Sequence, residues 1–171
     1  MLEAEEVGAR PKVRVEIAQT GWQYWKSEFE RHHYLEAPNM PYGTAYVGFV
    51  GEEPVAHLGM TTMWAGNRVA ARACRMVVKP EWQGAGIGMR FLNTLAQREL
   101  DGEGWAKRPA PTYFHTAHPA LLAALKRDRR WRQVSAKLHG GRAAKVHGKQ
   151  SMKYGGHWRG VAGFAYGLEE K

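Results

Sequence analysis

Three glycines lie close together in the segment Gln83–Gly88, which reads QGAGIG. This segment follows an apolar run ending at Val78 and precedes a stretch with helical periodicity. Glycine lets the main chain approach an anion closely, and the first N–H groups of a helix have no partner within that helix. A strand, a tight turn and a helix in this order therefore predict a pyrophosphate-binding loop.

Histidines supply a second set of candidates for chemistry. His32 and His33 are followed by Tyr34, while His115 and His118 stand at the end of a predicted strand. An imidazole titrates near neutral pH, at about 6.5, so it can serve as a general base. A solvated helix face for the first pair and simple packing for His115 remain open. We expect no metal site, because no acidic or thiolate ligand stands near the second pair.

Arg75 is an unusual residue for the strand predicted over Val69–Val78. A guanidinium in a central strand needs an anionic partner, so an ion pair with a carboxylate and contact with substrate or cofactor are both open. Strand alternation places Arg75 on the face of Ala73 and Val77, with Met76 on the other face.

The charge of the chain is uneven. Lys and Arg number 25 against 16 Asp and Glu, and the whole formal excess of +9 lies in residues 126–171. Aromatic residues are interleaved with these charges, a combination typical of surfaces that hold unstacked bases. We therefore expect a nucleic acid partner, with DNA favoured, although a solvated basic surface or one that serves cofactor phosphates is the alternative. The candidate nucleic-acid-binding residues are Arg130, Trp131, Arg132, Lys145, Lys149, Lys153, Trp158 and Arg159.

Composition limits the class of protein. With 171 residues and 44% hydrophobic content, the chain fits one globular domain, predicted over residues 12–171 after a flexible acidic tail at 1–11. Cys74 is the sole cysteine and is expected to be a small apolar strand residue. No apolar stretch approaches the roughly 20 residues of a membrane span, so we expect a cytoplasmic protein without a membrane partner. Monomer and homodimer both remain open.

The pattern predicts alternating strands and amphipathic helices. The expected strands are Lys12–Ile17, Thr44–Val50, Pro54–Met63, Val69–Val78, Thr112–Thr116 and Val161–Tyr166. The expected helices are a short one capped by Thr20 and carrying Trp22, Trp25 and Phe29, one over Gly88–Leu100 and one over Pro119–Arg130. Residues 136–160 are expected to form a long loop.

The segment Val78–Gly88, VKPEWQGAGIG, resembles the acyl-CoA signature of the GCN5-related N-acetyltransferase (GNAT) superfamily. The resemblance implies an α/β fold with a mixed, mostly antiparallel sheet flanked by helices, and an N-acyltransferase that uses acetyl-CoA or another acyl-CoA. It also implies that the cofactor lies along the strand before the loop and on the loop itself. The implied cofactor-binding residues are Met76, Val77, Val78, Gln83, Gly84, Gly86, Ile87, Gly88 and Met89. The helix Pro119–Arg130 departs from many members of that superfamily because it has no tyrosine to protonate the leaving thiolate.

Shorter motifs resemble phage-type GNAT relatives, including the Mom family, which modifies adenine in DNA. They are the His-Tyr pair at His33, the Arg-x-Val-Val strand at Arg75, the Thr-x-His-Pro step at Thr116 and the basic, aromatic C-terminal region. This resemblance implies that Tyr34 and Arg75, with His33 beside them, act at the reaction centre. The candidate catalytic residues are thus His33, Tyr34, Arg75 and His115. Three functions stand: an acyltransferase whose acceptor is a nucleic acid or an associated amine, a Mom-like adenine modifier without ordinary acetyl-CoA chemistry, and an inactive module that binds CoA or nucleic acid.

Overall fold

The computed structural model describes residues 13–20, 22–33, 43–139, 145–146, 149–150 and 159–168. Seven strands form one sheet in the order β1-β2-β3-β4-β5-β9-β6. Their bounds are β1 Glu16–Thr20, β2 Thr44–Val50, β3 Glu53–Ala65, β4 Arg68–Val78, β5 Thr112–Thr116, β6 Trp131–His139 and β9 Arg159–Tyr166. Two short strands, β7 Lys145–Val146 and β8 Lys149–Gln150, pair with each other. Every pair in the large sheet is antiparallel except β4 with β5.

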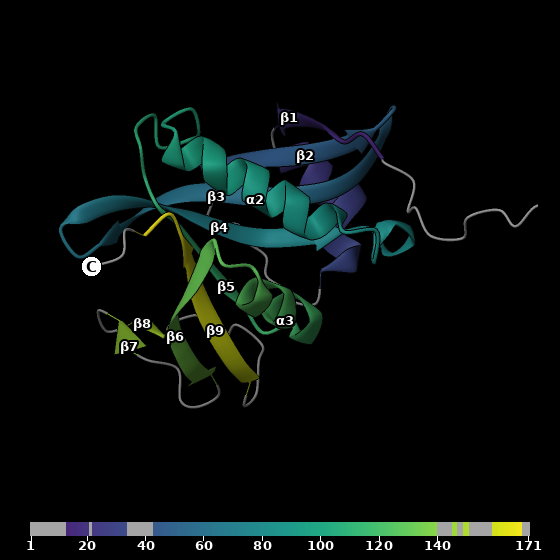
Figure 1. Ribbon diagram of the computed structural model, residues 1–171. Coiled ribbons are helices and arrows are strands. Elements are labelled where there is room, and N and C mark those ends of the chain that lie inside the picture. Colours follow the sequence, from purple (N-terminus) through teal and green to yellow (C-terminus); the bar gives the residue numbers. More distant parts are fainter. Residues whose placement is uncertain are drawn as a thin grey trace, which may run out of the picture.

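Helices lie on both faces of this sheet. Figure 1 shows α2 crossing one face of β2–β4, with the first helical segments on the opposite face. The helical segments are α1 Trp22–Tyr24, the π-helix η1 Trp25–Phe29, the 3-10 helices η2 Glu30–His32 and η3 Pro80–Trp82, α2 Ile87–Leu100 and α3 Pro119–Arg127. The sheet thus separates two hydrophobic clusters.

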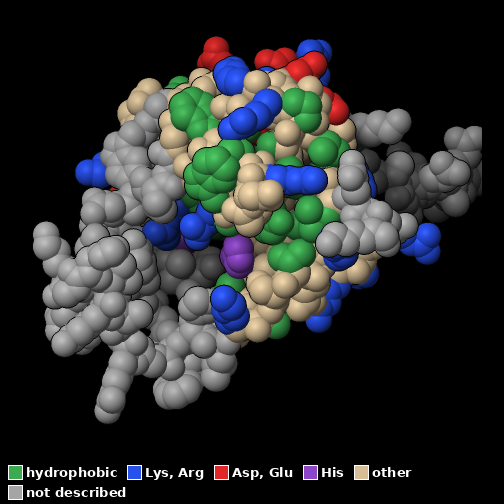
Figure 2. Space-filling view, turned by 90° about the vertical axis from the view of Figure 1, so that its left-hand side faces the viewer, with side chains coloured by type: hydrophobic (Ala, Val, Ile, Leu, Met, Phe, Trp, Pro, Cys, Tyr) green, Lys and Arg blue, Asp and Glu red, His purple; other side chains and the backbone are tan. Residues whose placement is uncertain are grey.

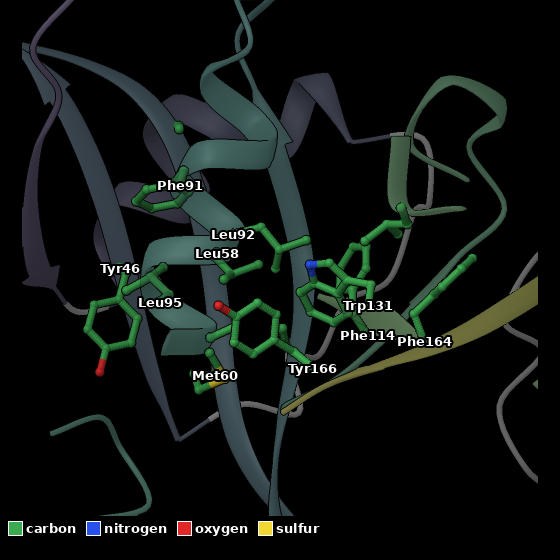
Figure 3. Close-up of a cluster of buried hydrophobic side chains, with 14 of the residues drawn as sticks. Tyr46, Leu58, Met60, Phe91, Leu92, Leu95, Phe114, Trp131, Phe164 and Tyr166 are labelled. Atoms are coloured by element: carbon green, nitrogen blue, oxygen red, sulfur yellow. The ribbon is translucent and has the colours of Figure 1, made fainter. Parts of the chain in front are cut away.

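The larger cluster lies between α2 and the sheet. Phe91, Leu92 and Leu95 of α2 are buried against strand residues such as Leu58 and Phe114 (Figure 3). The spacing of the three helix residues puts them on one face, as the sequence predicts. The smaller cluster, on the opposite face, joins Trp25 and Phe29 of η1 to Val47 and Val77. These two helix aromatics are almost fully buried, so the predicted apolar stripe is confirmed for them.

Most predicted elements are confirmed, some with shifted ends. The strands Thr44–Val50 and Thr112–Thr116 have the predicted bounds, and the helix over Gly88–Leu100 begins one residue earlier. The first strand was predicted too early in the chain, because Thr20 ends β1 instead of capping a helix. The loop predicted over residues 136–160 is wrong at its start, since β6 runs to His139. The tail predicted at 1–11 lies outside the described residues.

Candidate functional site

The pairing between β4 and β5 is short and ends abruptly. Three register pairs join the two strands, from Ala71 with Thr112 to Ala73 with Phe114. Beyond that point β4 continues to Val78, and Figure 1 shows the two strands diverging. The diverging ends leave the edge of β4 beyond Ala73 without a strand neighbour among the described residues. This open edge leads directly into the glycine segment.

The glycine segment has the geometry of an anion cradle. Gly84 and Gly86 have φ angles of 82° and 76°, and a Cβ added to either would meet no atom within 4 Å. Gly86 is the N-cap of α2, and the first helical hydrogen bond runs from Arg90 N to Gly86 O at 3.3 Å. The preceding N–H groups of the first helical turn therefore point out of the helix end, where its dipole is positive. This end of α2 suits a phosphate group.

The last residues of β4 present main-chain groups to the open edge. Lys79 N donates to Val55 O at 3.0 Å, so antiparallel alternation directs the N–H and C=O of Val78 away from β3. The side-chain amide of Gln83 donates to that Val78 carbonyl at 2.9 Å. Val77 is different, because its main chain pairs with His57 of β3 and its side chain is buried. The main chain of Val78 thus faces the open edge, whereas that of Val77 faces β3.

A β-bulge in β4 sets the direction of Arg75. His57 pairs with Val77 and Gly59 pairs with Cys74, so two residues of β4 lie opposite one residue of β3. Arg75, the first residue of the bulge, has a φ of 51°, an uncommon conformation for a side chain other than glycine. The extra residue interrupts strand alternation at this point.

The bulge corrects the predicted face of Arg75. Ala73 and Met76 pack in the cluster beneath α2, whereas Val77 lies in the cluster on the other face. Arg75 is on the Val77 side, because its Nη1 lies 3.5 Å from Nδ1 of His33. The expectation that it shares a face with Ala73 is therefore wrong. Among the described residues, no carboxylate forms an ion pair with Arg75.

His57 is a buried histidine that is not among the residues predicted from the sequence. Its ring lies 4.9 Å from that of Trp25 and 5.4 Å from that of Phe29, measured between centroids. Burial lowers the pKa of His57 to about 4, so the ring is neutral at physiological pH. The one available signal was an imidazole between Ala56 and Leu58 in a strand that is otherwise apolar at this point.

The structure brings some of the candidate catalytic residues together. His33 and Arg75 are in contact, and the ring of His33 also meets Trp25 at 5.4 Å between centroids. Tyr34 lies outside the described residues. His115 is exposed on β5, opposite Gly163, and its Nε2 stands 2.8 Å from the position that a Cβ of Gly163 would take. Its neighbour in the sequence motif, His118, instead caps α3, because its Nδ1 accepts a hydrogen bond from Leu121 N at 3.4 Å.

The candidate nucleic-acid-binding residues have different surroundings. Arg130 pairs with Asp128 at 2.7 Å, and this hydrogen bond lowers the pKa of Asp128 to about 2. Trp131 is 5% exposed and lies among the buried side chains of the larger cluster (Figure 3), so its predicted base-stacking role is corrected to a core role. Its Nε1 donates a hydrogen bond to Asn93 Oδ1 at 2.6 Å. Arg132 is exposed on β6. The structure describes the main chain but not the side chains of Lys145, Lys149 and Arg159, while Lys153 and Trp158 lie outside the described residues.

Cys74 matches its expected role. Burial raises the pKa of its thiol to about 11, so it stays protonated and unreactive.

Within the part of the chain that the structure describes, no helix is long and apolar enough to cross a bilayer.

No family model and no curated protein matches the sequence. Solved structures do match. An apo variant of agmatine N-acetyltransferase superposes with a TM-score of 0.63 at 14% identity, over 91% of this chain and 100% of that one. The ribosomal-protein-S18-alanine N-acetyltransferase from Escherichia coli gives 0.59 at 11% identity, over 90% and 93%. A GNAT family acetyltransferase from Elizabethkingia anophelis with acetyl-CoA bound gives 0.57 at 10% identity, over 90% and 98%. β4 and β5 diverge, and the glycine cradle connects β4 to α2. Together with these features, the likenesses establish that the chain has the GNAT fold.

Proposed function

We propose that this protein is a GNAT-type N-acyltransferase that uses acetyl-CoA or another acyl-CoA and works in the cytoplasm. One observation carries the proposal: β4 parts from β5 after Ala73, and its open edge leads directly into the glycine cradle at the start of α2. A diphosphate with a long amide-containing arm fits both features at once. The solved relative with acetyl-CoA bound supports the choice of cofactor.

The residues present fit CoA. The N–H groups of Ile87, Gly88 and Met89, at the first turn of α2, would hold the pyrophosphate, together with the loop from Gln83. The left-handed conformation of Gly86 has open space around it, which leaves room for a phosphate next to the main chain. The arm would pair with the outward main-chain groups at the end of β4 as an added strand does. The side-chain amide of Gln83 donates a hydrogen bond to the Val78 carbonyl, and this bond would have to break for the arm of CoA to pair there.

Acyl transfer to an amine requires proton transfers and charge stabilisation near the point where β4 and β5 diverge. When bound, acetyl-CoA supplies a thioester whose C–S bond breaks as the C–N bond forms, while the amine loses one proton and the thiolate gains one. Arg75 points its guanidinium toward His33, so it can hold an anionic part of the acceptor. His33 and His115 are the candidate bases. The helix α3 carries no tyrosine, so the acid for the thiolate has to come from another element.

The acceptor is a nucleic acid or an amine associated with one. The relatives named above act on agmatine and on an alanine of a ribosomal protein, so their acceptors differ and do not select one here. The excess of positive charge in residues 126–171 supports a polyanionic acceptor. DNA is favoured.

A second candidate function is Mom-like modification of DNA adenine on the same fold. The contact between Arg75 and His33 favours it, because it joins two residues that the Mom-like motifs select. In this function the cradle need not bind acetyl-CoA.

Three measurements test these functions together. We expect acetyl-CoA to raise the thermal midpoint of the protein, and labelled acetyl groups to reach a nucleic acid or amine in a broad acceptor screen. Altered adenosine masses in DNA from expressing cells, without any response to acetyl-CoA, would instead establish the second function. Binding of acetyl-CoA with no product in either assay would leave an inactive binding module and refute the proposal.

A further inference from the structure

One row of residues crosses the sheet through four neighbouring strand pairs. The registers connect Thr61 of β3 with Arg72 of β4, Tyr113 of β5, Ala165 of β9 and Arg132 of β6. Residues directly opposite one another in adjacent strands share a face. The row is therefore a continuous line of side chains on one side of the sheet.

This side is the one turned away from α2. The next row contains Ala73, Phe114, and Phe164, all buried in the cluster beneath α2, so alternation turns the first row outward. Among the described helices, α2 and α3 lie on the buried side, and η1 covers β2–β4 near Val47 and Val77. Arg72 and Arg132 are exposed.

Four of the strands bring no acidic side chain to this face. The sequences of β4, β5, β6 and β9 contain no aspartate or glutamate. Lys137, opposite Val161, adds an exposed cation on the same side as Arg132. Arg75 lies on the same side of the sheet, because its Nη1 is 3.5 Å from Nδ1 of His33, whose ring meets Trp25 of the cluster opposite α2. Figure 2, which views the left-hand side of Figure 1, shows Lys and Arg side chains over the middle of that side and Asp and Glu mainly along its upper edge.

We infer that this face binds a single strand of nucleic acid, with Arg72 and Arg132 on its phosphates and Tyr113 stacked on a base. Three strand spacings separate the two arginines, about 14 Å, which spans more than one nucleotide step. The half-buried ring of Tyr113 stands between them. Cations that flank an aromatic ring on a sheet face suit unstacked bases, whereas a duplex offers its bases only within the grooves.

The inference names the acceptor class of the proposed acyltransferase, and in that respect it rests on the proposed function. The row lies where β4 and β5 still pair, immediately before they diverge, and Arg75 lies further along β4 beyond the last of these pairs. A nucleic acid strand on this face therefore passes the point where β4 and β5 diverge, on the side opposite α2. Binding of the strand is measured without turnover, so the two proposals are tested separately.

The test is fluorescence anisotropy of a labelled 20-nucleotide single strand of mixed sequence, in DNA and RNA versions, over a range of salt concentrations. Substitution of both Arg72→Gln and Arg132→Gln removes two phosphate contacts, so the slope of log affinity against log salt should fall by about 1.4. Tyr113→Leu should weaken binding about 5- to 100-fold, and Tyr113→Phe should retain it because the ring remains.

A second basic surface provides the matched control. Arg90 and Arg98 line a groove of about 490 Å³ along α2, on the other side of the sheet. The double variant Arg90→Gln with Arg98→Gln has the same loss of charge, and it should bind the strand with an unchanged salt slope. If this variant loses the strand while the Arg72 and Arg132 variant keeps it, the inference is overturned.

Three further outcomes are decisive. Duplex DNA that binds tenfold more tightly than the single strand would refute the inference, since the stacked base is its central element. The thermal shift with acetyl-CoA is recorded for each variant. Strand binding without an acetyl-CoA response would refute the acyltransferase alone, and an acetyl-CoA response without strand binding would refute this inference alone.

Discussion

The Nδ1–H of His57 donates a 2.9 Å hydrogen bond to the main-chain carbonyl of Arg75. The bond joins β3 to the bulged residue of β4, and it supports a backbone conformation that a side chain other than glycine rarely adopts. The bulge in turn directs the Arg75 side chain toward His33. The position of a candidate catalytic group thus depends on a neutral ring buried behind the sheet.

The stability of the protein should fall as the pH falls from about 6.5 toward 4. In this window the unfolded chain protonates His57, whereas the folded protein keeps the ring neutral because its pKa is lowered to about 4. The loss amounts to about 3 kcal/mol from this one group. Urea unfolding at a series of pH values measures this loss in the free energy of unfolding. His57→Leu should flatten the slope, while substitution of the exposed His32 by Gln should not; an equal slope in His57→Leu contradicts the assignment.

Replacement of Arg75 should separate backbone strain from the role of the guanidinium. Alanine at position 75 retains the steric strain of a Cβ in the left-handed conformation, whereas glycine removes it. Arg75→Gly should therefore be more stable to unfolding than Arg75→Ala by about 1–2 kcal/mol. Denaturant midpoints give this difference. Both variants should lose acyl transfer at saturating acetyl-CoA. Full activity in Arg75→Gly would show that the guanidinium takes no part in the reaction.

Gly86→Ala should weaken acetyl-CoA binding at least tenfold. The added methyl group meets no protein atom, so the chain should still fold, with a cost of about 1–2 kcal/mol for the left-handed conformation. The methyl group would occupy the space that a phosphate needs beside the main chain. Gly51→Ala is the matched control, because Gly51 has a φ of 59° and equally open surroundings in the turn between β2 and β3. Calorimetric titration with acetyl-CoA should give an unchanged affinity for Gly51→Ala, and a comparable loss in both variants would rule out the cradle.

Glu99 should contribute strongly to stability. Its carboxylate is 1% exposed and accepts hydrogen bonds from Trp105 N at 2.6 Å and Ala106 N at 3.0 Å, which fixes the loop before β5. Glu99→Ala leaves two amides without their acceptor and should cost about 3 kcal/mol in chemical unfolding. Asp101→Ala, at an exposed position nearby, should change stability by less than about 0.5 kcal/mol. Similar effects of the two substitutions would contradict this account.

The sequence predicted the elements whose pattern is regular. Thr112–Thr116 alternates buried and less buried residues and is followed by a proline, so its bounds were visible. The strand β6 was missed because a bulge between Gln133 and Ser135 interrupts its alternation, and most of its described side chains are exposed. A pattern without a clear period resembles a loop.

The candidate site was predictable only where it consists of main chain. The glycine cradle is formed by consecutive residues, so a short segment of sequence is enough to predict it. The contact of His57 with Arg75 joins residues 18 positions apart through a bulge that no periodicity reveals. Trp131 was misplaced for a related reason, because its partner Asn93 lies on a helix 38 positions away. Contacts of this kind depend on tertiary pairing.

The strand β9 lies between β5 and β6, although both of those strands precede it in the chain. While the polypeptide is being synthesised, β5 and β6 therefore have no partner between them until residues 159–166 have left the ribosome. A product truncated before Arg159 exposes the inner edges of both strands, and such edges invite aggregation. Ribosome-bound chains stalled before and after this point should differ sharply in protease resistance.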